Sequence, residues 1–126
     1  MNKKLKIFTA IHKSTKRNYL QRMMDNKVYF MNLAKKYSKD YWDGDRRAGY
    51  GGYKFIENYW APVAQKLIKQ YNLNNRSKIL DVGCGKGFLL YEIKKILPKI
   101  TVRGFDISKY AIINSHEKVR KFIKVG

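Results

Sequence analysis

A glycine-rich segment and a carboxylate further along the chain are the residues of this sequence that could bind a ligand. Residues 81–87 read Asp-Val-Gly-Cys-Gly-Lys-Gly. Gly83 permits a sharp turn, Gly85 lets a ligand approach the main chain without meeting a Cβ, and Gly87 lets a helix start pack closely on a sheet. A helix that begins after this turn offers free N–H groups to an anionic group. Asp106 could accept hydrogen bonds from both hydroxyls of a ribose.

The spacing of these residues excludes two other phosphate-binding loops. A dinucleotide fingerprint, Gly-x-Gly-x-x-Gly, would need glycine where the chain has Phe88. A Walker A loop would need glycine in place of Leu80, and serine or threonine in place of Gly87. A carboxylate at position 106 would repel a 2′-phosphate, which disfavours NADP. What remains is an acidic residue followed by Gly-x-Gly-x-Gly, with a second acidic residue after the next strand.

The residues around the glycine segment alternate between strand and helix patterns. The predicted elements are a strand at 78–82, a glycine turn at 83–87, a helix at 88–97, a strand at 100–105, a helix at 109–122 and the start of a strand at 123–125. Pro98 ends the first of these helices, Ser108 caps the second, and Ile112 and Ile113 are expected to face inward. This βαβα order predicts an α/β fold with a parallel sheet and a right-handed crossover.

The amino-terminal half is predicted to be helical on both sides of a loop. Apolar residues three, four or seven apart predict a helix over 16–37 with one buried stripe. The stripe consists of Leu20, Met23, Met24, Met31, Ala34 and Tyr37. Residues 3–11 could be a strand or an arm, and 56–71 are predicted to form an amphipathic helix. Between the helices, residues 40–53 are rich in glycine, aromatic and charged residues and are predicted to form a loop. We call residues 40–53 the aromatic loop.

Two segments resemble motifs I and II of the class I S-adenosylmethionine-dependent methyltransferases. Residues 79–87 read Ile-Leu-Asp-Val-Gly-Cys-Gly-Lys-Gly, and residues 104–108 read Gly-Phe-Asp-Ile-Ser. The resemblance implies a Rossmann-like fold with additional amino-terminal helices and S-adenosyl-L-methionine as the cofactor. It covers nearly the whole chain but only the first part of the family's domain.

The resemblance also implies roles for the matching residues. The backbone near Gly83 and Gly85 would hold the methionine part of the cofactor. Asp81 would orient the turn and face the cofactor's amino group. Asp106 would bind the ribose hydroxyls, and Ile107 would pack on the adenine.

The resemblance gives three further residues of motif I no specific contact with the cofactor. Cys84 and Gly87 are expected to belong to the cofactor-binding segment, with Cys84 not acting as a nucleophile, and Lys86 is expected to be a solvated loop residue. The motifs name the methyl donor but neither a catalytic base nor the acceptor, which could be a small molecule, a lipid, a nucleic acid or a protein.

The aromatic loop resembles a segment of a group of bacterial methyltransferases. Its Asp-Gly-Asp-Arg-Arg and Tyr-Gly-Gly-Tyr sequences would then lie over the cofactor as part of a lid. Tyr50 and Tyr53 could stack on the cofactor, and Arg46 or Arg47 could meet a carboxylate or a phosphate. The alternative is that the arginines form local ion pairs with Asp43 and Asp45 that brace the loop.

These expectations divide the chain into two parts. Residues 1–55 would form the amino-terminal helix and the lid, and residues 56–126 the first part of the cofactor-binding domain. One edge of the first strand would lack a neighbour, and apolar faces would stay open. We therefore expect a truncated domain, an amino-terminal fragment of a protein of roughly 200 residues or more. Alone it would bind cofactor weakly or not at all; it would act as an oligomer or with a missing carboxyl-terminal half.

The composition leaves two other functional classes open. The net charge is +19, from 28 Lys and Arg against 9 Asp and Glu, which fits a weakly bound polyanion or simply a lysine-rich composition. This charge and the 14% of aromatic residues would suit a non-catalytic nucleic-acid-binding module. An NAD-dependent oxidoreductase-like domain would share the fold.

Other features bear on location and metals. No apolar run reaches the roughly 20 residues of a membrane span, and the start lacks a small-residue cleavage site. The single cysteine, Cys84, excludes an internal disulfide and a cysteine zinc site and fits a reducing cytoplasm. His12 and His116 are expected at the surface, and no metal site is predicted.

Overall fold

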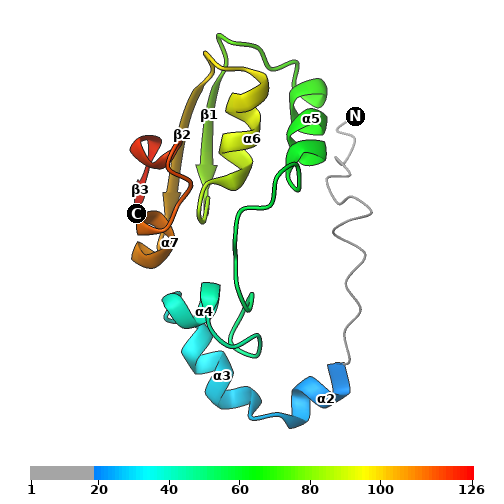
Figure 1. Cartoon of the computed structure of the whole chain (residues 1–126), viewed down its shortest axis with the longest axis vertical. Helices are drawn as coiled ribbons and strands as arrows, with labels where there is room; N and C mark the ends of the chain where they lie inside the picture. Colours follow the sequence, from blue (N-terminus) through cyan, green and yellow to red (C-terminus); the bar gives the residue numbers. More distant parts are fainter. Residues whose placement is uncertain (1–18) are drawn as a thin grey trace.

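A computed structural model describes residues 19–126 of the chain (Figure 1). In chain order the elements are α2 (Tyr19–Met24), α3 (Lys27–Ala34), α4 (Lys39–Asp43), α5 (Ala61–Gln70), β1 (Lys78–Val82), α6 (Phe88–Ile96), β2 (Thr101–Asp106), α7 (Lys109–Ile113), the 3₁₀ helix η1 (Arg120–Phe122) and β3 (Ile123–Val125). The segment 3–11 and His12 lie outside the described residues.

The three strands form one parallel sheet in the order β1-β2-β3. Ile79 pairs with Val102 and Asp81 with Gly104, and Gly104 in turn pairs with Ile123. The parallel register and the intervening helix α6 confirm the predicted α/β class and its partial Rossmann-like architecture. The predicted strand at 78–82 is confirmed at both ends.

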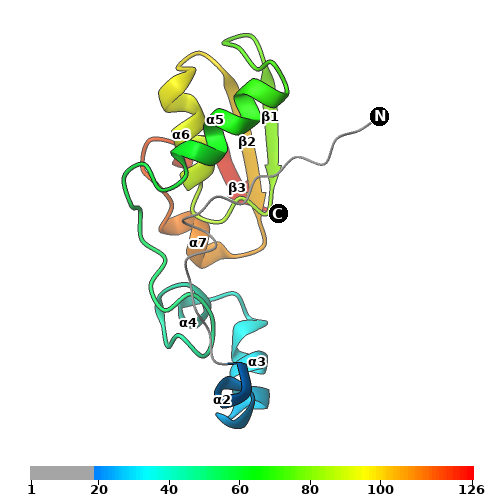
Figure 2. The same cartoon turned by 90° about the vertical axis from the view of Figure 1, so that its right-hand side faces the viewer.

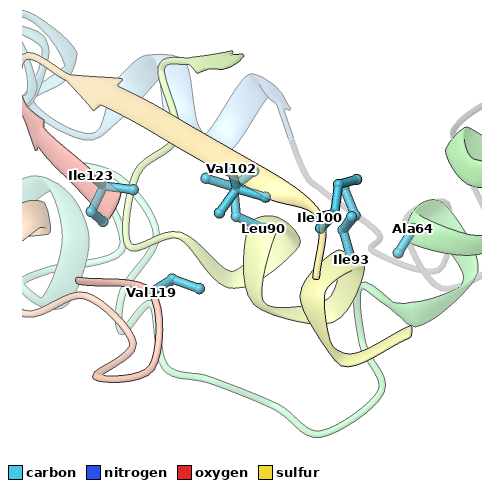
Figure 3. Packing of buried hydrophobic residues seen from close by; sticks show 7 residues of the cluster. All are labelled: Ala64, Leu90, Ile93, Ile100, Val102, Val119 and Ile123. Carbon is cyan, nitrogen blue, oxygen red and sulfur yellow. The ribbon is translucent and has the colours of Figure 1, made fainter. Parts of the chain in front are cut away.

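The hydrophobic core lies between one face of this sheet and helices α5 and α6. Figure 3 shows the seven buried residues of the main cluster, which come from α5, α6, β2, β3 and the segments that precede these two strands. They are Ala64, Leu90, Ile93, Ile100, Val102, Val119 and Ile123. Val102 lies on the sheet face that α6 covers, with Leu90 and Ile93 opposite it. Burial of these aliphatic side chains is the main stabilising term for this part of the chain.

The opposite face of the sheet and the outer edge of β1 are open. Among the described residues, β1 pairs only with β2. Leu80 and Val82, which point away from the core, keep 57% and 78% of their surface exposed. The βαβα pattern of the sequence predicted an unpaired edge and an open apolar face for this strand.

The predicted single helix over 16–37 is wrong. Helices α2 and α3 are separated at Asn26, whose φ of 48° is left-handed and cannot continue a helix. Leu20, Met24 and Met31 of the expected stripe are exposed, and the buried residue of α3 is Phe30. Figures 1 and 2 show the reason: α2 and α3 project beyond the carboxyl ends of the strands, so no strand within residues 19–126 lies against these helices.

Three other boundaries also differ from the predictions. Residues 39–43 are helical as α4, although this part of the aromatic loop has no clear periodicity. Helix α5 begins only at Ala61, because Pro62 suits a first helical turn. Helix α7 ends at Ile113 rather than near residue 122, since side chains of Asn114 and Ser115 bind carbonyls of its last turn.

The inward face of α7 also differs from the prediction. Ala111 is buried and Ile112 packs on the core, whereas Ile113 is exposed. The expected cap at Ser108 is confirmed, because its Oγ accepts a hydrogen bond from the backbone N–H of Ala111 at 3.0 Å.

Gly87 is required for packing, and a matched pair of substitutions can test this. Gly83 and Gly87 have φ angles of 80° and 78°, so alanine carries similar backbone strain at both positions. A Cβ on Gly87 would lie 2.8 Å from Val119, whereas at Gly83 no described heavy atom lies within 4 Å. We expect Gly87→Ala to lower the free energy of unfolding more than Gly83→Ala, by about 1–3 kcal/mol. Urea denaturation measures the difference, and equal losses would contradict the packing argument.

Candidate functional site

The glycine turn follows β1 and Asp106 ends β2, and the two meet through the N–H of Gly85. Figure 1 shows that the carboxyl ends of β1 and β2 lie at the same edge of the sheet. The backbone N–H groups of Gly83 and Cys84 both donate to the carbonyl of Phe105, at 2.8 and 2.9 Å. One carboxylate oxygen of Asp106 accepts the N–H of Gly85 at 2.8 Å. The other accepts the N–H of Ser108 at 2.8 Å. The Asp106 side chain therefore points at the glycine turn.

Two further groups of motif I lie beside this carboxylate. Asp81 is partly buried at the end of β1, and burial, together with the charge of Asp106, raises the pKa of its carboxyl group. Burial raises the pKa of the Cys84 thiol to about 12, with smaller contributions from Asp81 and Asp106. The thiol is therefore protonated at neutral pH, which disfavours a nucleophilic role.

A cleft of about 670 Å³ opens between the glycine turn and the aromatic loop. Its lining comes from both segments, from the start of α6 and from the residues between the aromatic loop and α5. The lining residues are Trp42, Arg46, Tyr50, Gly52, Tyr53, Lys54, Ile56, Tyr59, Trp60, Asp81, Gly83, Cys84, Gly85, Phe88 and Leu89. The size of the cleft and the aromatic rings in its wall suit a small organic ligand.

The structure places the predicted site residues unevenly around this cleft. Asp81, Gly83, Cys84, Gly85, Tyr50 and Tyr53 line it. Asp106 and Ile107 are not part of the lining; Asp106 is only 8% exposed, and Ile107 is exposed beside it. Gly87 is turned toward Val119 and the core.

Aromatic rings connect the loop to the start of α6. Trp42 stacks on Tyr50 with ring centroids 5.4 Å apart, and Tyr53 stacks on Phe88 at 5.1 Å. Tyr50 and Tyr53 are themselves 4.6 Å apart. Sequence reasoning did not single out Trp42, although a tryptophan within a glycine-rich loop was a signal that could have drawn attention to it.

Lys86 is not the solvated residue that the sequence suggested. It is 4% exposed, and its ammonium donates to Asp43 and to the carbonyl of Tyr53, each at 2.7 Å. The hydroxyl of Tyr110 and the N–H of Tyr53 also donate to the Asp43 carboxylate. Although burial opposes this, the hydrogen bonds from Lys86 and Tyr110 lower the pKa of Asp43. The Lys86–Asp43 pair therefore ties the aromatic loop to the glycine turn.

The two arginines of the loop behave differently. Arg47 pairs with Asp45, as the ion-pair alternative expected. It also pairs with Asp25 and lies over the ring of Phe30, whereas Asp43 pairs with Lys86 and with neither arginine. Hydrogen bonds from Arg47 lower the pKa of Asp45 to about 2. Arg46 instead lines the cleft, where its guanidinium donates to the carbonyl of Gly49.

The remaining predictions concern histidine, metals and membranes. His116 is partly buried and stacks on Tyr91, with ring centroids 3.9 Å apart, so its expected surface position is only half right. Burial lowers the pKa of its imidazole. Within residues 19–126, no three His, Cys, Asp or Glu side chains gather as metal ligands would. In the same range, no helix has the length and apolarity to cross a membrane.

A parallel sheet with a glycine turn after β1 and a carboxylate at the end of β2 defines a partial Rossmann-like domain. Residues 73–124 match a family model described as a methyltransferase domain. The match confirms the resemblance of this segment to the class I methyltransferases. The match spans β1 to β3 with the glycine turn, and it does not include the aromatic loop. No curated protein matches the chain.

The Lys86–Asp43 pair can be tested by amide exchange. Lys86→Met removes the ammonium from Asp43 and from the Tyr53 carbonyl, and hydrogen bonds to charged groups contribute about 1.5–3 kcal/mol. We expect hydrogen exchange at the Tyr53 amide to accelerate by about tenfold or more. Lys95→Met is the matched control, because its pair with Glu57 is exposed. Unchanged exchange at Tyr53 would contradict the role of Lys86.

Proposed function

We propose that the cleft binds S-adenosyl-L-methionine and that the chain supplies the cofactor-binding part of a methyltransferase. The observation that carries the proposal is the joint position of Asp81, Gly83 and Asp106 at the ends of two paired strands inside the matched family segment. The main chain at Gly83 is open to a ligand, since a Cβ there would meet no described atom within 4 Å.

The residues of the turn suit the methionine part of this cofactor. In the proposal, the backbone of Gly83, Cys84 and Gly85 holds that part, and the carboxylate of Asp81 faces its amino group. When bound, the cofactor supplies a methyl group on a sulfonium. The protein's contribution is to position it and to exclude water.

The nucleoside part would lie beside β2. Each Asp106 oxygen accepts one backbone N–H and keeps lone pairs for ribose hydroxyls. Ile107 follows it with an exposed aliphatic side chain that could pack on adenine. Gly87 supports the turn from the core side. We also propose that residues 1–55 act as a lid and residues 56–126 as the cofactor-binding domain, with Tyr50 and Tyr53 as the rings that face the ligand.

Equilibrium dialysis with labelled S-adenosylmethionine tests the assignment of Asp106. We expect Asp106→Asn to weaken binding by about tenfold or more, because hydrogen bonds of hydroxyls to a charged group contribute about 1.5–3 kcal/mol. Glu117→Gln is a control that removes an exposed carboxylate outside the cleft. Equal affinity of wild type and Asp106→Asn would contradict the ribose role.

The two alternative classes give different results. Stronger binding of NAD than of S-adenosylmethionine would favour an oxidoreductase-like domain. Steeply salt-dependent RNA binding that the cofactor does not change would favour a nucleic-acid-binding module.

A second test concerns the lid. Tyr53→Ala removes a ring that lines the cleft and stacks on Phe88. We expect it to weaken cofactor binding about tenfold by calorimetry, since ring contacts of this kind contribute about 0.5–1.5 kcal/mol beyond area burial. Tyr53→Phe keeps the ring and should bind like the wild type. An unchanged affinity of Tyr53→Ala would exclude the lid role.

A further inference from the structure

The space beside the second glycine of the turn is filled by the chain itself. A Cβ on Gly85 would lie 3.0 and 3.4 Å from two ring carbons of Trp42. At Gly83 the same construction meets no described atom within 4 Å. The absence of a side chain at Gly85 therefore makes room for the indole ring of Trp42, and this space is not open to a ligand.

Trp42 also lies beside both residues that bind the carboxylate of Asp106. Its indole N–H donates to the hydroxyl of Ser108 at 2.9 Å, and that hydroxyl donates to the carbonyl of Tyr37. Gly85 and Ser108 are the two residues whose N–H groups bind Asp106, and Trp42 contacts both of them. Asp106, on this side of the cleft, is only 8% exposed and absent from the lining, while Asp81 and Gly83 line the cleft.

The cleft is consequently open on one side and closed on the other. A ligand's amino-acid part could reach Asp81 and Gly83, but ribose hydroxyls could not reach Asp106 while Trp42 stays against Gly85. We propose that Trp42 occupies the ribose side of the site in the absence of ligand, and that an adenosine-containing ligand must displace it. This inference rests on the proposed function, because it uses Asp106 as the ribose-binding group.

The element that carries Trp42 is suited to such a movement. Helix α4 has five residues, and α3 and α2, which precede it, leave most of their apolar side chains exposed. Figures 1 and 2 show α4 beyond the carboxyl ends of the strands and apart from the main core. The Trp42–Ser108 hydrogen bond and the Lys86–Asp43 pair hold α4 to the residue before α7 and to the glycine turn, but an element outside the main core opens at lower free energy than a core strand. When only a fraction of molecules has Trp42 displaced, the apparent dissociation constant is the intrinsic one divided by that fraction.

The decisive measurement is the affinity for S-adenosylhomocysteine and for adenosine, by calorimetry, in the wild type, Trp42→Phe and Trp42→Ala. Removing the competing ring should tighten binding of both ligands at least fivefold in Trp42→Ala. Trp42→Phe keeps a ring but loses the bond to Ser108, so its affinity should fall between the other two. Methionine, which needs only the open side, should bind all three proteins equally.

A fluorescence measurement reports on the ring directly. The chain has two tryptophans, so Trp60→Phe leaves Trp42 as the sole indole. Trp42 is 6% exposed, and we expect S-adenosylhomocysteine to shift its emission to longer wavelength as the ring enters water.

Three results would overturn the inference in distinguishable ways. Weaker or equal binding by Trp42→Ala would show that Trp42 is a wall of the site and not a competitor. An unshifted emission on saturation would show that the ring does not move. If no protein, wild type included, binds S-adenosylhomocysteine or S-adenosylmethionine, the proposed function fails and this inference fails with it. Circular dichroism of each variant verifies that the sheet remains folded.

Discussion

The carboxylate of Asp106 holds together the two loops from which the site is built. It accepts one N–H from Gly85, after β1, and one from Ser108, before α7. Hydrogen bonds to a charged group contribute about 1.5–3 kcal/mol each, and the low exposure of this carboxylate keeps water from replacing them. The glycine turn therefore takes its shape from the end of β2, and the site exists only when β1 and β2 are paired in register.

The aromatic loop is attached to this pair of loops at two neighbouring residues. Asp43 binds the ammonium of Lys86, and Trp42 contacts Gly85 and Ser108. The loop thus contacts both family motifs at once. A buried ion pair favours one arrangement because either partner alone would be an uncompensated charge. The position of Tyr53 in the cleft depends on this attachment. Its N–H donates to Asp43, and its carbonyl accepts a hydrogen bond from Lys86.

Local chemistry made much of the sheet region predictable. The strand 78–82 is a short apolar run that the glycine turn ends, and α6 stops just before Pro98. Ser108 caps α7 through its own hydroxyl. The same reasoning failed for residues 16–37, because an apolar stripe marks a buried helix face only where another surface covers it. In the part of the chain that the structure describes, no sheet lies against α2 and α3, and Asn26 interrupts the helix.

The sequence by itself determined the strand, the glycine turn and the carboxylate that follows the second strand, because each depends on residues close together in the chain. The sequence also predicted that the Asp106 side chain lies near the glycine turn, because parallel strands have their carboxyl ends at the same edge of the sheet. Only the tertiary structure decided that Lys86 is buried and that Trp42 lies against Gly85. Their partners are 43 or more residues away, at Asp43 for Lys86 and at Gly85 and Ser108 for Trp42. No local pattern encodes such contacts, because they form only when folding brings the two segments together.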